Sequence, residues 1–483
     1  MSLLRTAVRL GKWFASALVV LALAVYFVRA FESRRLPPLG PEHRIEFENE
    51  FDASMEDSTD WDAYLAIEDK LAAELDEKIP SASRAGSPAD RYFAGSQTWP
   101  GRFGGNWNRS WEMTVPSARG VAVLLHGLSD SPYSMLATAE TLAGAGYNVV
   151  TVRMPGHGFA VGGLKQTNHE DWQAAVRIAV RRAMQRPGAE QSFLLVGYSN
   201  GGLLAVDYAL HCGSSVEGLP CPDGLVLLSP AMTVRPAAVL MDLHAAISWM
   251  PYFERFAWLE ILPEIDPFKF TSFPKHAVWE IYGIAKHVNR ELADPHQTQK
   301  LPPILTFQSA IDYTVGSNGI VDSLYGRLQA NGSELVLYDV NRNSTMLALM
   351  KTIPPDPAAA FVARAPLNYG VTVLKNRDPS TNAVEAERLA AGAAEPEFEA
   401  TSLRWPAQVY SLSHIAIPFR PDDAVYGDGS TPDAASPELT FGAMAPRGEK
   451  NVLQLPADYF LRMRYNPFFA FQAQVLTEWL GTL

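Results

Sequence analysis

A serine stands between glycines in the segment Gly197-Tyr198-Ser199-Asn200-Gly201, where one apolar run ends and another begins. The residues before it are typical of a strand, and those after it are typical of a helix. G-x-S-x-G in that setting predicts a strained turn that lifts the serine hydroxyl out of a sheet, at a helix N-terminus that favours negative charge. Side chains at 197 and 201 would collide across the turn. Ser199 is therefore a candidate nucleophile, and a purely structural glycine turn is the alternative.

The elements that would position this serine begin at about Trp111. Short apolar segments end in glycine, proline or polar residues, and helix-like stretches lie between most of them: GVAVLLHG, YNVVTVRMPGHG, SFLLVGYS, GLVLLSPA and PPILTFQSAID. Continuous apolar strands separated by helices predict an α/β fold, a mostly parallel sheet with helices on both faces. Ligands bind beyond the carboxyl ends of such strands. The polar residues after each run are therefore candidate site residues.

From about residue 111 to 483 the chain resembles the α/β-hydrolase superfamily, and more closely its monoglyceride lipase, lysophospholipase and serine-aminopeptidase-like branch. The resemblance is carried by LLHGLSDSPYSM, RMPGHG and GYSNGG. It implies that the backbone N–H groups of Leu128 and Asn200 form an oxyanion hole, in which one donor contributes about 2.7–4 kcal/mol. His126 and His157 belong to these turns, and we interpret both as structural.

A serine nucleophile needs a base, and the base needs an orienting carboxylate. In this fold the acid precedes the histidine in the chain. Asp312, in an Asp-x-x-Val turn that resembles the family's acid turn, is the predicted acid, with Asp339 as runner-up. His414 is the only histidine after Asp312, and it is the predicted base. If it is not the base, the candidates lie earlier: His244, His276 and His287.

The family usually places its histidine just after the last strand, which is predicted here as SELVLYDV. No histidine follows that strand directly, and an insertion of about 341–406, rich in Ala, Pro and Glu, precedes His414. We expect the insertion to leave the sheet as a loop and return, because loop closure costs only about 0.6 kcal/mol per doubling of length.

The N-terminal segment, residues 1–35, contains an uncharged apolar run from Trp13 to Val28. With its flanking residues it can just span about 30 Å of hydrocarbon. We favour a retained signal anchor, a transmembrane helix. A signal peptide cleaved near Ala22–Ala24 and a buried helix of a soluble protein are the alternatives.

Residues 36–110 form a predicted acidic connector and loop. Between Pro41 and Lys78 there are 14 Asp or Glu residues and three Lys or Arg residues. Apolar residues recur there at helical spacing, which predicts a solvated helix docked by one face and capped by Ser58 or Thr59. The members of this stripe are Trp61, Tyr64, Leu65, Leu71 and Leu75. Residues 80–105 are expected to be irregular.

Within the hydrolase domain, the segment of about 232–300 lies between two predicted strands and is too long for a simple crossover. It is dense in Trp, Phe, Leu and Met, which predicts a helical cap and an apolar acyl pocket. Such a pocket favours esters. An aminopeptidase would need acidic groups for the substrate amine, and Glu260, Glu264 and Asp266 leave that alternative open.

The two cysteines, Cys212 and Cys221, flank a short loop after the nucleophile helix. This predicts a disulfide worth roughly 2.5–3 kcal/mol, with two free thiols as the alternative. Disulfides persist in oxidising compartments. Together with the N-terminal segment, the pair predicts a catalytic domain outside the cytoplasm, periplasmic or otherwise extracytoplasmic.

The composition is globular, and the net charge is −12 with no cluster of Lys and Arg beyond residue 35, so we expect no nucleic-acid partner. No histidine or cysteine has HExxH or CxxC spacing, and we expect no metal or cofactor. The sequence predicts a membrane-anchored serine hydrolase that cleaves carboxylic esters, lipid or acyl esters above all, through an acyl-enzyme. The alternatives are an aminopeptidase-like amide hydrolase and a non-catalytic binding protein of the same fold.

Overall fold

The centre of the molecule is a ten-stranded sheet in the order β1-β3-β2-β4-β5-β8-β9-β10-β11-β12. The computed structural model describes residues 2–213, 218–233, 248, 252–311, 317–430, 441–444 and 462–483, and statements below refer to these. Neighbouring strands are parallel from β3 to β10, while β1, β11 and β12 are antiparallel to their neighbours. The strands are β1 Trp111–Met113, β2 Gly120–Leu125, β3 Tyr147–Val152, β4 Phe193–Tyr198, β5 Gly224–Leu228, β8 Ile304–Ser309, β9 Glu334–Tyr338, β10 Gly370–Asn376, β11 Ala383–Leu389 and β12 Glu397–Arg404.

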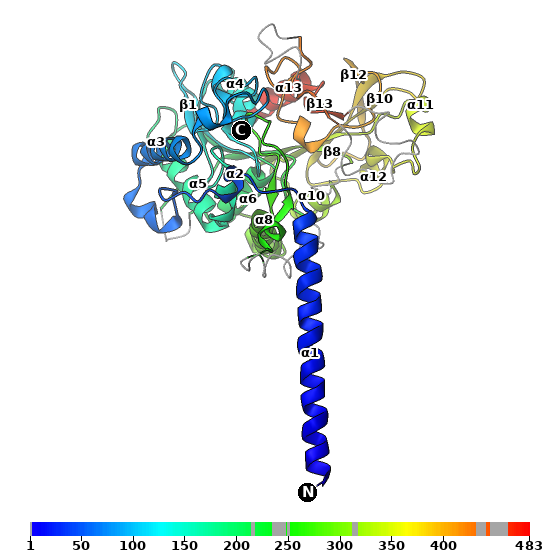
Figure 1. Ribbon diagram of the computed structural model, residues 1–483. Coiled ribbons are helices and arrows are strands. Elements are labelled where there is room, and N and C mark those ends of the chain that lie inside the picture. Colours follow the sequence, from blue (N-terminus) through cyan, green and yellow to red (C-terminus); the bar gives the residue numbers. More distant parts are fainter. Residues whose placement is uncertain are drawn as a thin grey trace.

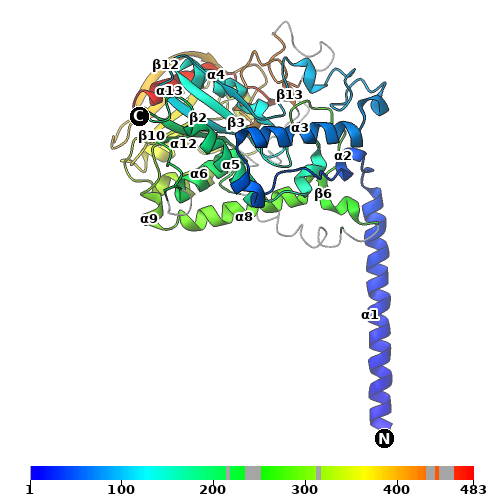
Figure 2. The ribbon, with the colours of Figure 1, turned by 90° about the vertical axis from the view of Figure 1, so that its left-hand side faces the viewer.

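Helices cover both faces of this sheet (Figures 1 and 2). Alternate residues of each central strand enter two separate cores, because side chains alternate across a strand. In β2, Val121 and Val123 pack with α5, α6 and α8, whereas Ala122 and Leu124 pack with α4 and α13. The helices are α4 Leu136–Gly144, α5 His169–Met184, α6 Asn200–His211, α8 Lys275–Glu291 and α13 Phe469–Leu480. This arrangement confirms the predicted fold class.

The predicted insertion of about 341–406 is not a loop. It begins with two short helices, α11 (Ser344–Ala348) and α12 (Pro357–Val362), and then adds β10, β11 and β12 to the edge of the sheet. The prediction that SELVLYDV, which contains β9, is the last strand was therefore wrong. The chain returns from the far edge of the sheet before it reaches His414.

The predicted cap lies partly outside the described residues, which omit 234–247 and 249–251. In the part that the structure describes, α8 is a crossover helix whose apolar face joins the core under α5 and α6. Residues 252–274 contain one 3-10 turn, η7 (Glu254–Ala257), and two short paired strands, β6 (Trp258–Glu260) and β7 (Phe273–Pro274). This stretch is irregular rather than helical.

Helix α1 (Ser2–Arg35) projects away from the rest of the molecule (Figure 1). Its segment Gly11–Arg35 is long and apolar enough to cross a membrane, with a mean hydropathy of 2.2, and a signal sequence would have the same properties. Near its C-terminal end, the Tyr26 ring lies 5.0 Å from the Phe253 ring, and Arg34 lies 3.7 Å from Glu254.

The acidic connector forms α3 (Trp61–Lys78), with Trp61, Tyr64 and Leu71 buried. Its N-cap is Asp60, whose carboxylate accepts a hydrogen bond from the Ala63 N–H at 2.8 Å, and not Ser58 or Thr59. The preceding 3-10 turn, η1 (Ala53–Ser58), explains the difference, because the Thr59 hydroxyl donates back to the Met55 carbonyl oxygen within it.

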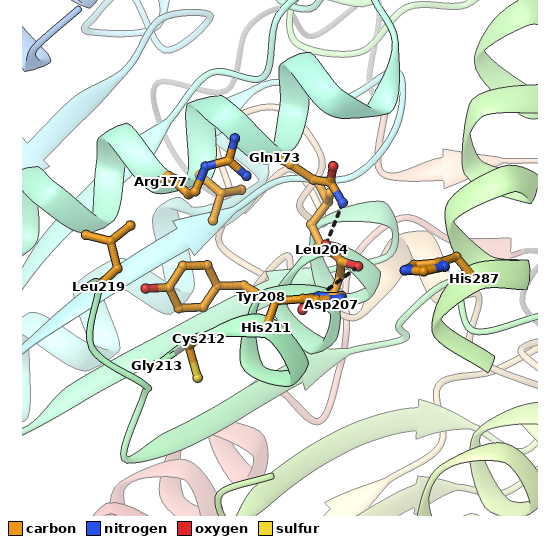
Figure 3. A pocket seen from close by; sticks show the side chains of 11 residues that line it. Gln173, Arg177, Leu204, Asp207, Tyr208, His211, Cys212, Gly213, Leu219 and His287 are labelled. Carbon is orange, nitrogen blue, oxygen red and sulfur yellow. Dashed lines mark hydrogen bonds and ion pairs between the residues drawn. The ribbon is translucent and has the colours of Figure 1, made fainter. Parts of the chain in front are cut away.

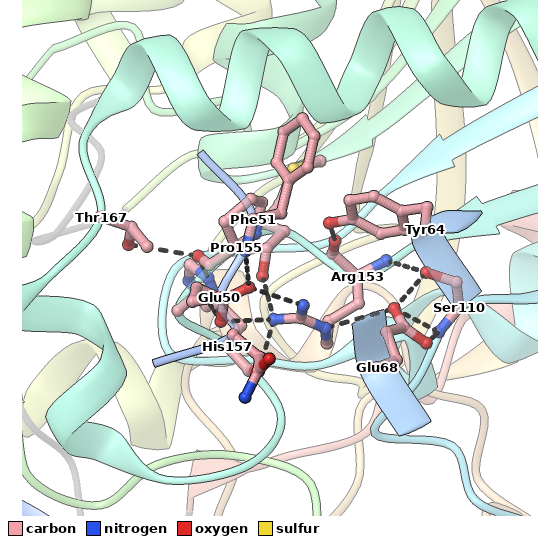
Figure 4. A network of polar contacts seen from close by, with 12 residues as sticks. Glu50, Phe51, Tyr64, Glu68, Ser110, Arg153, Pro155, His157 and Thr167 are labelled. Carbon is pink, nitrogen blue, oxygen red and sulfur yellow. Dashed lines mark hydrogen bonds and ion pairs between the residues drawn. The ribbon is translucent and has the colours of Figure 1, made fainter. Parts of the chain in front are cut away.

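The connector is held to the hydrolase domain by a buried arginine, Arg153, in the loop after β3 (Figure 4). Its guanidinium lies 2.9 Å from Glu50 and 3.2 Å from Glu68. Glu68 also accepts a hydrogen bond from the Ser110 hydroxyl, and the Tyr64 hydroxyl donates to the Arg153 carbonyl oxygen. The docking of the connector helix by one face was predicted, but the buried charges that hold it were not.

The predicted disulfide is confirmed: Cys212 is bonded to Cys221, with the Cα atoms 5.1 Å apart. The bond closes the loop directly after α6. It fixes the C-terminal end of the helix that begins beside Ser199.

We predict that Arg153→Met lowers the free energy of unfolding by about 3–5 kcal/mol, because it removes the buried cation that Glu50 and Glu68 share. Asp69→Asn is the matched control, since it breaks the pair of Asp69 with Arg109 on a side chain that is 72% exposed, and it should change stability by less than about 0.5 kcal/mol. Urea unfolding of both variants measures the difference. Equal effects would contradict the role given to Arg153.

Candidate active site

Ser199 occupies a strained turn between the central strand β4 and helix α6. Its backbone has φ +52° and ψ −112°, a left-handed conformation that residues other than glycine seldom adopt. The Ser199 N–H continues the sheet by donating to the Leu228 carbonyl oxygen at 2.9 Å, and its own carbonyl oxygen accepts from the Leu203 N–H at 3.2 Å, which begins the helix. Backbone strain of this kind is typical of functional sites.

The glycines on both sides of the serine are required by close backbone contacts. A Cβ on Gly197 would lie 2.2 Å from the Gly201 carbonyl oxygen, and a Cβ on Gly201 would lie 2.0 Å from the Leu125 carbonyl oxygen. The sequence predicted the first clash across the turn. It did not predict the second, which brings the N-terminus of α6 against the end of β2.

The two histidines in the neighbouring turns support the backbone. His126 is buried, its Nε2 accepts a hydrogen bond from the Met154 N–H at 2.9 Å, and its Nδ1 therefore donates to the Gly127 carbonyl oxygen. Burial lowers the pKa of His126 well below its usual range and that of His157 to about 3. Both rings stay neutral near pH 7. His126 ties the loop after β2 to the loop after β3, and the His157 ring contacts the Pro155 carbonyl oxygen at 3.0 Å within its own loop.

The loop with the proposed oxyanion donor follows β2 directly. Leu128 is buried, and the next residue, Ser129, has φ +63° and accepts a hydrogen bond from the Phe270 N–H at 2.8 Å. Asp130, also buried, forms a 2.7 Å ion pair with Lys269. Two adjacent residues of the cap region thus hold this loop in place.

The other predicted donor, Asn200, is the first residue of α6 and is buried. The first N–H groups of a helix have no partner within the helix. The backbone N–H of Asn200 therefore lies at the positive end of the helix dipole, beside the Ser199 hydroxyl.

His414 begins a short 3-10 turn, η9 (His414–Ala416), and is partly exposed. The segment before it passes the carboxyl ends of two strands. The Ser309 hydroxyl, at the end of β8, donates to the Leu412 carbonyl oxygen at 2.9 Å, and the Asn341 N–H, after β9, donates to the Tyr410 carbonyl oxygen at 2.7 Å. The structure therefore brings His414 to the edge of the sheet where Ser199 lies.

Asp312 lies outside the described residues. The strand before it in the chain is β8, which lies two strands from β4 in the sheet. The two strands are therefore roughly 10 Å apart. The runner-up, Asp339, is buried and its carboxylate is bound by Arg342 through both oxygens, one of them at 3.0 Å. Burial nevertheless raises the pKa of Asp339. Its carboxylate is already engaged by an arginine.

Sequence reasoning missed the residues that brace this edge. Lys269 reaches Asp130 from the cap region, and Asp266 accepts from the Tyr426 hydroxyl at 2.5 Å and pairs with Arg464 at 2.8 Å. A single lysine within the otherwise apolar stretch PFKF was the one available signal for the first contact.

The parallel sheet, the helices on both faces and the strained serine turn after a central strand define an α/β-hydrolase fold. Residues 116–277 match the family model described as serine aminopeptidase, S33. This part of the chain is similar to the branch of α/β-hydrolases that contains the S33 serine aminopeptidases and the monoglyceride lipases.

A thermostable monoacylglycerol lipase from Bacillus sp. (strain H-257) is 36% identical over 89 residues, which are 18% of this chain and 34% of that protein. The chain thus spans about a third of the length of this curated relative. A structure from a study of the metagenome-derived lipolytic enzymes LipS and LipT aligns with 21% identity over 48% of this chain and 87% of that one, with a TM-score of 0.39. The monoacylglycerol lipase of Paleococcus ferrophilus aligns with 18% identity over 48% and 88%, with a TM-score of 0.37.

We predict that Gly201→Ala abolishes activity, because its Cβ has no room beside the Leu125 carbonyl oxygen and the start of α6 must move. Gly283→Ala is the matched control: this glycine lies in α8, a Cβ added to it would have no neighbour within 4 Å, and the variant should gain up to about 1 kcal/mol of stability. Circular dichroism and ester turnover of both variants test this. A fully active Gly201→Ala enzyme would contradict the close approach.

Proposed function

We propose that this protein is a serine hydrolase that cleaves carboxylic esters, with Ser199 as nucleophile, His414 as base and Asp312 as the carboxylate that orients His414. The observation that carries the proposal is the strained conformation of Ser199 between β4 and α6. Its support is the path of the 409–412 segment, which delivers His414 to the same edge of the sheet.

In the proposed reaction the Ser199 Oγ attacks the ester carbonyl carbon while His414 takes the hydroxyl proton. The oxyanion is stabilised by the N–H groups of Leu128 and Asn200. His414 then gives the proton to the leaving alcohol, and an acyl-enzyme remains. Water, deprotonated by His414, attacks the acyl carbon and releases the carboxylic acid. Asp312 stabilises the imidazolium and fixes the tautomer of the ring.

Esters are favoured over peptide amides because two of the three acidic groups named for the aminopeptidase alternative, Glu264 and Asp266, are already engaged. Glu264 accepts hydrogen bonds from the N–H groups of Thr271 and Ser272, and Asp266 is bound by Arg464. An aminopeptidase needs a free carboxylate for the substrate amine. The Bacillus relative is named a monoacylglycerol lipase, which points to a lipid ester as substrate.

Helix α1 would hold the enzyme at a membrane as a retained anchor, beside its lipid substrate. The Cys212–Cys221 disulfide supports a catalytic domain on the oxidising side of that membrane, the periplasmic or extracytoplasmic side.

We predict that His414→Ala and Asp312→Asn lower kcat by orders of magnitude, the second by up to about 10⁴, because the imidazole is left in the wrong tautomer. His276→Ala is the matched control and should keep normal turnover, since its Nε2 is engaged by the Thr167 carbonyl oxygen at 3.0 Å. Steady-state kinetics on a short-chain ester provide the measurement. Normal turnover in His414→Ala would overturn the proposed base, and loss in Asp339→Asn alone would transfer the acid to that residue.

We further predict that a series of monoacylglycerols and p-nitrophenyl esters of rising chain length is hydrolysed, whereas aminoacyl amides are not. The Ser199→Ala variant serves as the blank. Release of N-terminal residues from peptides without ester turnover would favour the aminopeptidase alternative. A folded wild-type protein inert toward both classes would favour the non-catalytic binding protein.

A further inference from the structure

Two histidines and two carboxylates face each other across helices α6 and α8, at the opposite end of α6 from Ser199. Each helix contributes one pair at i, i+4 spacing, which places both members on the same face. We call these four residues the inter-helix cluster: Asp207 and His211 on α6, and His287 and Glu291 on α8.

The ring nitrogens of the two histidines converge on one carboxylate oxygen. His211 Nε2 and His287 Nε2 each lie 3.3 Å from Glu291 Oε1. The other nitrogen of His211, Nδ1, lies 2.8 Å from the Asp207 main-chain carbonyl oxygen and donates to it. In the neutral ring, Nε2 then carries a lone pair that points at a carboxylate. That arrangement is repulsive unless a proton or a metal ion lies between the two groups.

A second observation comes from Asp207, which is only 4% exposed. Its Oδ2 accepts a hydrogen bond from Gln173 at 2.7 Å. Its Oδ1 accepts none from the residues that the structure describes, although it is buried and lies 3.6 Å from His211 Nδ1. Figure 3 shows His287 on α8 directed toward this carboxylate. A buried carboxylate oxygen without a hydrogen bond is costly unless something binds it.

We propose that the inter-helix cluster binds a divalent transition-metal ion, Zn²⁺ by preference, that joins α6 to α8. Imidazole nitrogens together with carboxylate oxygens suit this class of ion, at about 2.0–2.2 Å from the metal. One ligand atom from each of Asp207, His211 and His287 lies within 4.8 Å of the others. Both histidine side chains are 48% exposed, so their rings can turn by the roughly 1 Å that tetrahedral ligation requires.

The surroundings of the cluster suit a built site. A cavity of about 290 Å³ opens beside it, lined by Arg177, Tyr208 and Leu219 among others (Figure 3). The Cys212–Cys221 disulfide follows His211 directly and fixes that end of α6. Asp207 and His211 follow Ser199 by 8 and 12 residues, so the site lies about 12–18 Å along the helix from Ser199, which makes the metal a structural link and not a participant in ester cleavage.

The test is isothermal titration of ZnCl₂ into the full chain in detergent, purified without a histidine tag and freed of metal by a chelator. We expect one Zn²⁺ per chain and a rise of a few degrees in the unfolding temperature. His211→Ala and His287→Ala should each weaken binding at least tenfold and abolish that rise. His296→Ala, an exposed histidine on α9 (Pro295–Thr298), is the matched control and should bind as the wild type does.

Replacement of Zn²⁺ by Co²⁺ gives a second readout, because visible absorption bands report ligation directly even if a variant is less stable. Wild-type protein without stoichiometric binding would overturn the proposal. Unchanged affinity in His287→Ala would do the same. Loss of binding in His169→Ala instead would move the site to the second cluster on α5 and α8, His169 with Glu170 and Glu280, and would also overturn it.

Discussion

The approach of two backbones at Gly201 is the constraint on which the candidate site depends. The first turn of α6 lies so close to the Leu125 carbonyl oxygen that no side chain fits between them. Because β4 ends at Tyr198 and α6 begins at Asn200, the chain turns sharply at Ser199, which has a positive φ. The same contact places the loop after β2, which contains Leu128, beside the N-terminus of α6. The proposed nucleophile and the proposed oxyanion donors are thus positioned together by one close backbone contact.

The parts of the chain outside the sheet are tied to this edge by buried charges rather than by apolar packing alone. Arg153 fastens the connector to the loop after β3, and Lys269 fastens the cap region to the loop after β2. Both cations lie beside loops that carry the site, and each pairs with a carboxylate from another segment. A buried pair of this kind costs desolvation, but removal of one partner costs more. The connector and the cap region therefore contribute to the geometry of the sheet edge that carries the candidate site.

The sequence predicted what depends on local pattern. The central strands, the serine turn and the supporting role of His126 all follow from short motifs with a definite backbone requirement. It failed where the partner is distant: Glu68 looked like a solvated acidic residue because Arg153 is 85 positions away. Strands β10, β11 and β12 were missed because the insertion of about 341–406 was judged by its overall composition and not segment by segment. Most residues of β12, EFEATSLR, are exposed, as its place at the sheet edge allows, so its sequence lacks the apolar pattern of a buried strand.

Covalent labelling with a fluorophosphonate probe tests the central claim most directly, because the probe reacts only with a serine that is both exposed and activated by a base. We predict that mass spectrometry finds the probe on the peptide that contains Ser199. Labelling should be absent in Ser199→Ala and far slower in His414→Ala, with folding unchanged in both. Labelling that persists in Ser199→Ala, or none in the folded wild-type protein, would contradict the account.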